Sequence, residues 1–302
     1  MISQERIEFY HREGYVGMEN VLPDEDLAAL RQVTDEFLEK SRNYTENNTV
    51  YDLEPGHTPK TPKLRRLKNP VQQHETYDRI LRHPAILDIV EQLLGPDIYT
   101  NGDKLNMKLP EFGSPVEWHQ DWAFYPHTND DMLAVGVAMD DMLQVNGCLQ
   151  VLPGSHKRPI LDHHFEGHFA GMVTDQNFDD SDAVPIEVHA GGISIHHVRA
   201  LHGSLPNLSD IPRRLLLLQY CAADSWCIYK TVDWEAHLGQ FVRGEPTNQP
   251  RLENVPVRLP LPPVLRSGSI YEAQSIVGKS NFGNADAERC GEMRRCGDAE
   301  KV

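Results

Sequence analysis

The sequence is poor in cysteine and has no long apolar run. Its five cysteines form no Cys-x-x-Cys pair: Cys148, Cys221, Cys227, Cys290 and Cys296. This argues against a thiolate zinc site and against a disulfide framework, and it fits a reducing compartment. Unbroken apolar runs reach only about four residues, as at 215–218, which is far short of the roughly 20 residues that a membrane helix needs.

Basic residues are also scarce, with 29 Lys and Arg against 45 Asp and Glu and a formal net charge of -16. Such a chain is a poor partner for nucleic acid or an anionic membrane, so we expect neither. A polar, helix-like segment begins at Ser3 and the chain ends Glu-Lys-Val, so neither a signal peptide nor a peroxisomal address is visible. We therefore expect a cytoplasmic protein, and the oligomeric state stays open.

Hydrophobic periodicity predicts helices first and short strands afterwards. Apolar residues recur at helical spacing over 4–12, 24–41 and 84–94, as on the buried faces of amphipathic helices. Turn residues then separate five strand-like runs: 98–109, 132–139, 148–152, 193–198 and 215–221. This order predicts a mainly β fold with flanking α, in which the N-terminal helices pack on a sandwich or barrel.

The remaining segments define the expected boundaries. Residues 1–277 form one predicted domain with its β core at about 97–223, and 278–302 read as a polar, flexible tail. Two long polar segments, 43–69 and 162–185, have the length of functional loops.

One segment, Trp118-His119-Gln120-Asp121-Trp122, holds the only His-x-Asp pair in the chain. Side chains at i and i+2 of an extended segment point the same way, so His119 and Asp121 can share a metal ion. Among 15 histidines this pair alone is a weak signal. His202, 83 residues later, offers a third ligand. Rival distal histidines are His163, His164, His168, His196 and His197.

Two imidazoles and one carboxylate leave open positions on one side of a metal, which suits Fe(II) and O2 chemistry. Zinc can use the same ligand types. The Pro212-Arg213-Arg214 segment favours iron, because an inward-facing Arg can clamp the far carboxylate of 2-oxoglutarate. Neighbours on a strand face opposite ways, so only one of the two arginines can point inward.

Several linked segments resemble the phytanoyl-CoA dioxygenase family, whose members are Fe(II)- and 2-oxoglutarate-dependent oxygenases on a double-stranded β-helix (a jelly-roll, cupin-like fold). The segments are Met139-Asp140-Asp141, Asn146-Gly147-Cys148-Leu149, Val151-Leu152-Pro153-Gly154-Ser155-His156-Lys157 and His202-Gly203-Ser204. The resemblance is dense from about residue 104 to 223 and looser over the N-terminal helices.

The resemblance implies a role for six residues. The family's metal ligands fall on His119, Asp121 and His202. Its 2-oxoglutarate arginine falls on Arg213, its serine on Ser204, and a further cosubstrate position on Lys104. The chain has Val137 where phytanoyl-CoA dioxygenase itself has Trp, and it lacks that enzyme's N-terminal peroxisomal extension. These departures favour a small polar metabolite or a natural-product intermediate as substrate over an acyl thioester.

The expected reaction is hydroxylation of an unactivated C–H of a small molecule, with release of succinate and CO2. Related halogenases lack the carboxylate ligand, whereas Asp121 is present. Desaturation, ring formation and epimerisation stay as alternatives. The cofactors implied are Fe(II), 2-oxoglutarate and O2. Expected substrate contacts are Trp122, Phe124, Lys108, His164 and His168.

Two other functions compete with this one: a β-sandwich that binds a metal or ligand without catalysis, and a zinc hydrolase. The prime substrate is not readable from the sequence, because loops set it in this fold.

Overall fold

A computed structural model describes residues 2–110, 113–258, 264 and 269–282. Its helices are α1 (Gln4–Glu13), α2 (Asp24–Lys40), α3 (Pro70–Gln73), α4 (Glu75–Leu81), α5 (Pro84–Leu94), α6 (Trp234–Leu238) and α7 (Ile270–Gln274). Its strands are β1 (Tyr15–Met18), β2 (Tyr51–Leu53), β3 (Leu64–Lys68), β4 (Ile98–Lys108), β5 (Val116–His119), β6 (Met132–Ala138), β7 (Leu149–Val151), β8 (His164–Phe165), β9 (His168–Phe169), β10 (Val184–Ile186), β11 (Ile193–His197), β12 (His202–Ser204), β13 (Arg213–Ala222) and β14 (Phe241–Arg243).

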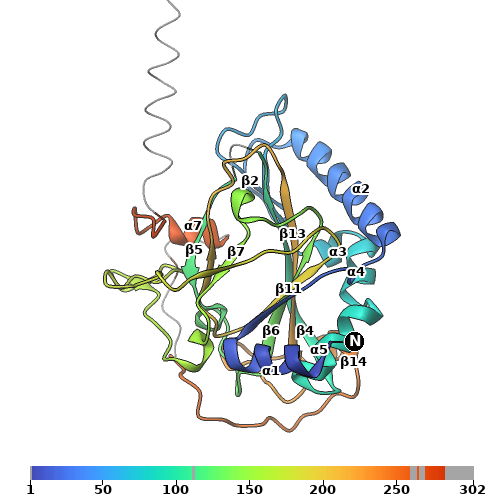
Figure 1. Cartoon of the computed structure of the whole chain (residues 1–302), viewed down its shortest axis with the longest axis vertical. Helices are drawn as coiled ribbons and strands as arrows, with labels where there is room; N and C mark the ends of the chain where they lie inside the picture. The colour runs from blue at the N-terminus through green and yellow to red at the C-terminus, as the bar shows by residue number, and fades with distance from the viewer. Residues whose placement is uncertain (1, 111–112, 259–263, 265–268, 283–302) are drawn as a thin grey trace, which may run out of the picture.

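Two antiparallel sheets face each other. The larger has the order β1-β11-β6-β13-β4-β3-β2, with β14 also paired to β4, and the smaller has the order β10-β7-β12-β5. Figure 1 shows α2 to α5 on the outer side of the larger sheet and the smaller sheet on its other side. The larger sheet therefore has one face packed on helices and one face turned towards the smaller sheet, where polar side chains can gather.

Local sequence signals set the helix ends. The Ser3 side chain accepts a hydrogen bond from the backbone N–H of Arg6 at the start of α1, which satisfies one of the free N–H groups of the first turn. Gly14 ends this helix with a φ of 82°, a left-handed conformation that favours glycine. Pro84 opens α5 at a position where its missing N–H costs no hydrogen bond.

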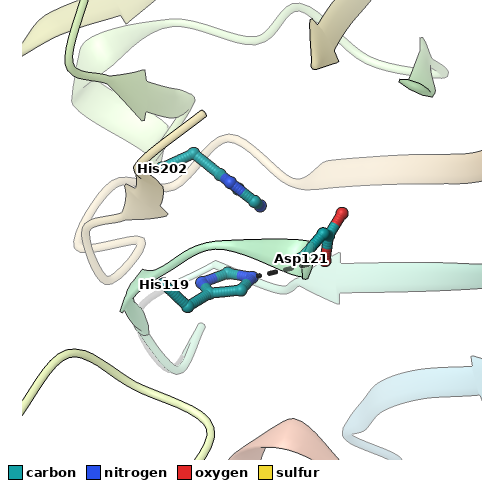
Figure 2. A group of neighbouring side chains, drawn as sticks. All are labelled: His119, Asp121 and His202. Atoms are coloured by element: carbon teal, nitrogen blue, oxygen red, sulfur yellow. Dashed lines mark ion pairs between the residues drawn. The ribbon is translucent and has the colours of Figure 1, made fainter. Parts of the chain in front are cut away.

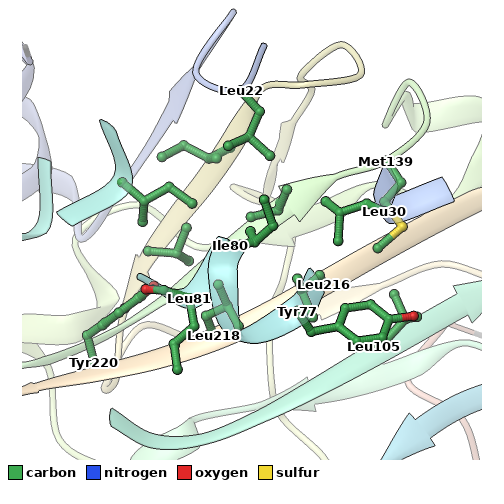
Figure 3. Packing of buried hydrophobic residues seen from close by; sticks show 14 of the residues in the cluster. Leu22, Leu30, Tyr77, Ile80, Leu81, Leu105, Met139, Leu216, Leu218 and Tyr220 are labelled. Atoms are coloured by element: carbon green, nitrogen blue, oxygen red, sulfur yellow. The ribbon is translucent and has the colours of Figure 1, made fainter. Parts of the chain in front are cut away.

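The main hydrophobic core lies between the helices and the outer face of the larger sheet. Figure 3 shows helix residues packed against strand residues, among them Leu30, Tyr77, Ile80, Leu81, Leu105, Leu216, Leu218 and Tyr220. Burying a side chain of this size stabilises the fold by roughly 1.5–3 kcal/mol. Buried hydroxyls are paired: Tyr77 with Thr34 at 2.9 Å, and Tyr220 with the carbonyl of Leu81 at 2.8 Å. The helices thus fix the sheet that supports the site.

The predicted loop at 43–69 is wrong in part, because it contains β2 and β3, which extend the larger sheet beside β4. Leu64 and Leu67 are fully buried there, although charged residues surround them in the sequence. Of the expected tail, 278–302, the structure describes residues 278–282. The Ser280 hydroxyl and the Asn281 N–H donate to the carboxylate of Glu117, at 2.5 and 2.7 Å. The rest of that tail, 283–302, lies outside the described residues.

Across the described residues, no helix is both long enough and apolar enough to cross a membrane.

Candidate metal centre

The strand pair β5–β12 brings two distant histidines together. His119 and His202 stand directly opposite each other in the antiparallel register, and their ring centroids are 4.1 Å apart. Directly opposed residues of an antiparallel pair have their side chains on the same face. The two imidazoles are therefore in direct contact although they are 83 residues apart in the sequence.

Asp121 joins them because the chain turns immediately after β5. Asp121–Ala123 form a 3-10 turn, and the N–H of Trp122 donates to the carbonyl of Val198 at 2.9 Å, which ties this turn to the end of β11. One ligand atom each from His119, Asp121 and His202 lies within 4.8 Å of the other two. Figure 2 shows the three side chains converging, with Nε2 of His119 3.8 Å from Oδ1 of Asp121.

Backbone carbonyls set the orientation of both rings. Nδ1 of His119 lies 2.8 Å from the carbonyl oxygen of Glu117, and Nδ1 of His202 lies 2.9 Å from that of Ala200. A carbonyl only accepts, so each Nδ1 carries the proton and donates it. Each Nε2 then presents a lone pair, the form in which imidazole binds a metal.

The electrostatics of the three groups suit a cation. Burial lowers the pKa of His119 to about 4 and holds the pKa of His202 well below its ordinary value. Burial alone raises the pKa of Asp121, but Lys104 and the neighbouring histidines outweigh it and hold this pKa well below its usual range. At neutral pH the centre therefore offers two neutral imidazoles and one carboxylate, and it need not lose protons to bind a metal.

Arg213 lies in the same enclosed cavity as the three ligand candidates. This cavity of about 20 Å³ is also lined by Lys104, Asn106 and Ser204. Arg213 is 2% exposed, and its Nε and Nη2 have no hydrogen-bond partner in the described part of the chain. A buried charge without a partner is costly. The chemistry of these side chains thus matches a ligand that binds a metal at one end and offers a carboxylate to Arg213 at the other, as 2-oxoglutarate does.

A larger cavity of about 440 Å³ adjoins the first, since Lys104 and Asp121 line both. Its wall also includes Arg66, Phe124 and Gln219. Ligand pockets commonly have volumes of about 300–1,000 Å³. This cavity therefore gives a small molecule access to the carboxylate side of the candidate metal centre.

The five residues expected to contact the substrate lie in different places in the structure. Of these five, only Phe124 lines the larger cavity. Trp122 instead points into a hydrophobic cluster beside Tyr99 and donates its indole N–H to the carbonyl of Pro256 at 2.7 Å. Its position next to Asp121 in the sequence is misleading, because the 3-10 turn directs consecutive side chains to different sides.

The polar residues expected to grip the substrate are also placed elsewhere. Lys108 is fully buried, and its ammonium donates to the backbone carbonyls of Ser204 and Leu205. His164 lies in another cavity, where its Nδ1 is 2.6 Å from Oδ1 of Asp162. His168 contacts the carbonyl of Glu166 with its Nδ1 at 3.1 Å. Each has a partner of its own within the chain.

Most residues that line the larger cavity are not predicted from the sequence, and Arg66 and Gln219 are two of the polar ones. Arg66 lay in a segment expected to be a loop, so its strand position was not visible. Gln219 left a signal: it shares the two-residue alternation of Arg213 along β13, at the end of a run of leucines. A polar residue among the inward-facing positions of a buried strand indicates a functional site. The sequence shows this pattern in 213–219.

Comparison with known proteins agrees with this geometry. The family model described as Phytanoyl-CoA dioxygenase (PhyH) matches residues 10–215. The chain is 34% identical to a probable alpha-ketoglutarate-dependent hypophosphite dioxygenase of Stutzerimonas stutzeri, over 93% of this chain and 100% of that protein. It is 28% identical to the peroxisomal phytanoyl-CoA dioxygenase of Rattus norvegicus, over 77% of this chain and 71% of that protein.

The fold has solved counterparts. EctD from S. alaskensis in its apoform superposes with a TM-score of 0.64 at 20% identity, covering 76% of this chain and 80% of that chain. The expected fold class, mainly β with a jelly-roll, cupin-like core, is confirmed. The chain belongs to the phytanoyl-CoA dioxygenase family and is an iron- and 2-oxoglutarate-dependent oxygenase.

Proposed function

We propose that His119, Asp121 and His202 hold Fe(II), and that Arg213 and Ser204 hold the distal carboxylate of 2-oxoglutarate. Together, bound iron and 2-oxoglutarate supply the oxidising chemistry: O2 is consumed, the cosubstrate becomes succinate and CO2, and one oxygen atom enters the substrate. With the carboxylate ligand present, hydroxylation is the proposed outcome. The observation that carries this proposal is the buried Arg213 in the cavity of the ligand candidates, two of whose nitrogens have no hydrogen-bond partner among the described residues.

The chain's own residues perform three tasks in this proposal. Backbone carbonyls keep the two imidazoles in the metal-binding tautomer. Lys108 donates to the carbonyls of Ser204 and Leu205 and so holds the end of β12, where Ser204 lines the same small cavity as Arg213. Phe124, which lines the larger cavity and packs edge-on against the ring of His119 at 5.9 Å, excludes water from one side of the centre.

For the prime substrate we propose a small organic anion. Arg66 and Lys104 both line the larger cavity, and neither forms an ion pair within 4 Å among the described residues. Asp103 and Asp121 line the same cavity and interact electrostatically with Arg66 and Lys104 respectively. Since the proposal assigns the charge of Asp121 to the metal, Lys104 is left to balance a negatively charged ligand. The inner sheet face supports this choice, because Arg66 stands opposite Asn106 on β4 and Lys104 is two residues away.

The names of two relatives suggest further substrates to test. The Stutzerimonas stutzeri relative is named for hypophosphite, a small anion, and another relative is named as an L-proline trans-4-hydroxylase. Hypophosphite is far smaller than a cavity of about 440 Å³. We therefore place organic phosphonates, phosphinates and carboxylates ahead of hypophosphite.

The test is succinate formation from 2-oxoglutarate by the purified protein with Fe(II), ascorbate and O2. The panel contains small phosphonates, phosphinates and carboxylates, hypophosphite, and neutral esters or amides of the same skeletons. Substrate-dependent succinate from an anion, absent with its neutral counterpart, is the expected result. No turnover across the panel would favour a non-catalytic binder, and activity that persists without O2 and 2-oxoglutarate would favour a zinc hydrolase.

We also propose that the protein works in the cytoplasm as one catalytic domain, with no nucleic-acid partner. Cys148, Cys221 and Cys227 are free thiols, as in a reducing compartment. Cell fractionation tests the location.

A further inference from the structure

His196 lies beside the candidate metal centre without belonging to its ligand group. It is on β11 and 1% exposed, and neither of its ring nitrogens has a hydrogen-bond partner in the described residues. Its ring centroid is 4.2 Å from that of His202, and its Nε2 is 3.5 Å from Oδ2 of Asp121. Buried polar atoms are nearly always paired in native proteins, so an unpaired buried imidazole at this place indicates a role.

The sheet register explains how this ring reaches Asp121. On the larger sheet His196 stands opposite Ala134 of β6, and Ala134 stands opposite Gln219 of β13. Side chains in such a row share one face. Ala134 has only a methyl group, which leaves space between its two larger neighbours. Asp121, which follows a strand of the facing sheet, directs its carboxylate towards this row.

The two oxygens of Asp121 therefore have different surroundings. Oδ1 lies 3.8 Å from Nε2 of His119, on the side of the other ligand atoms. Oδ2 lies 3.5 Å from Nε2 of His196 and 3.5 Å from Nε2 of Gln219. The amide of Gln219 is an N–H donor to Oδ2, and a proton on Nε2 of His196 would supply a second donor, which would keep that oxygen away from a cation.

We propose that His196 is a positioning residue: it donates from Nε2 to Oδ2 of Asp121, so that only Oδ1 binds the metal. A carboxylate that binds through both oxygens occupies two positions of the metal. With two imidazoles, it would leave only two of six positions for a bidentate cosubstrate and O2, one fewer than they need. The inference rests on the proposed function, because it assigns Asp121 to the metal.

The alternative role, a fourth ligand, is disfavoured by the geometry. Within the described part of the chain, the group whose ligand atoms lie within 4.8 Å of one another contains His119, Asp121 and His202 but not His196. Partners that orient metal ligands typically change metal affinity by about 10–100-fold when they are removed. We therefore expect a loss of metal affinity in this range when His196 is replaced.

The experiment compares the wild-type protein with His196→Phe, His196→Gln and the control His197→Gln. His197 is the next residue on β11 and lines a separate cavity with Tyr10 and His156. Each purified apoprotein is titrated with Co(II) by calorimetry in the presence of 2-oxoglutarate, and its thermal midpoint is measured without metal. His196→Phe is expected to lose about 10–100-fold in Co(II) affinity. His196→Gln, which keeps an N–H donor, is expected to recover most of it, and His197→Gln should bind as the wild type does.

Unchanged Co(II) affinity in folded His196→Phe would overturn the proposal, as would equal losses in the Phe and Gln variants. X-ray absorption at the metal edge of the wild-type complex gives an answer independent of any variant. Two coordinated imidazoles are expected, and three would make His196 a ligand and refute the positioning role. A wild-type protein that binds no Co(II) would instead contradict the proposed metal site itself, so the two failures are distinguishable.

Discussion

Arg213 and Arg214 are neighbours in the sequence with opposite surroundings in the structure. Arg214 points away from the site, and its Nη2 and Nε donate to the two carboxylate oxygens of Asp140 at 2.7 and 2.8 Å. Arg213 points inward and is buried, and two of its nitrogens have no hydrogen-bond partner in the part of the chain that the structure describes. Strand alternation produces this contrast, and it provides a site variant and a matched control one residue apart.

Replacing Arg213 by Met removes the proposed partner of the 2-oxoglutarate carboxylate. A hydrogen bond to a charged group is worth about 1.5–3 kcal/mol, so the Michaelis constant for the cosubstrate should rise by roughly 10–100-fold. Steady-state succinate formation measures it. Arg214→Met should lower the thermal midpoint through its lost pairing with Asp140 while leaving that Michaelis constant unchanged. Equal effects of the two substitutions on the constant would contradict the assignment.

Replacing Asp121 by Ala tests the metal assignment. The substitution removes the anionic ligand and leaves two neutral imidazoles, so Fe(II) affinity and succinate formation should both fall below detection. Anaerobic Fe(II) titration and a succinate assay report the two effects separately. Hydroxylation that continues undiminished in Asp121→Ala would show that the carboxylate is not a ligand.

The proposed substrate charge depends on Arg66 and Lys104. Arg66→Met should raise the Michaelis constant for an anionic substrate by about tenfold, the effect of losing roughly 1.4 kcal/mol of binding, while the constant for the cosubstrate stays unchanged. Lys104→Met should raise both constants, since Lys104 lines both cavities. Arg65→Met is the control, because Arg65 stacks over Tyr271 at 4.3 Å and lines a different cavity. Kinetics in which Arg66 and Arg65 variants are indistinguishable would refute the substrate proposal.

Stability should depend on pH through buried neutral histidines such as His163. Burial lowers its pKa to about 4, and its Nε2 accepts a hydrogen bond from the N–H of Gln120 at 2.9 Å. The unfolded chain has an ordinary pKa near 6.5 and binds a proton first on acidification. The contribution of His163 is therefore complete above about pH 6.5 and is lost as the pH falls towards 4.

Urea denaturation of the apoprotein between pH 4 and 7.5 measures this dependence. The free energy of unfolding should fall with decreasing pH, and His163 should account for up to about 1.4 kcal/mol per pH unit of the slope. His163→Asn should flatten the slope by that amount. A slope that the substitution leaves unchanged would show that the pKa of His163 is the same in the folded and the unfolded chain.

Much of the fold was predictable because its signals are local. The helix over 84–94 has Pro at its start and Gly after its end, and it was predicted with the observed bounds. The long strands β4, β6 and β13 were predicted within one or two residues, because apolar residues dominate them. The hairpin of β2 and β3 was missed, since its stability comes from pairing with β4 rather than from its own composition.

The site residues that belong to a sequence motif could be predicted. Those that face the site without belonging to a motif could not. His119, Asp121 and His202 were expected together, and the structure brings their ligand atoms within 4.8 Å. Trp122 was expected at the same place because of its neighbour, but side-chain direction after a 3-10 turn depends on backbone angles that the sequence does not reveal. His196 was only one of several rival histidines, because its role depends on a cross-strand row that forms only in the folded sheet.

The most direct test of the account is a crystal structure of the protein with Fe(II) and 2-oxoglutarate, grown without O2 and recorded at the iron absorption edge. The predicted result is one iron bound by Nε2 of His119, Oδ1 of Asp121 and Nε2 of His202, with the distal carboxylate of 2-oxoglutarate on Arg213. Iron bound at other residues, or a cosubstrate whose distal carboxylate lies away from Arg213, would contradict it.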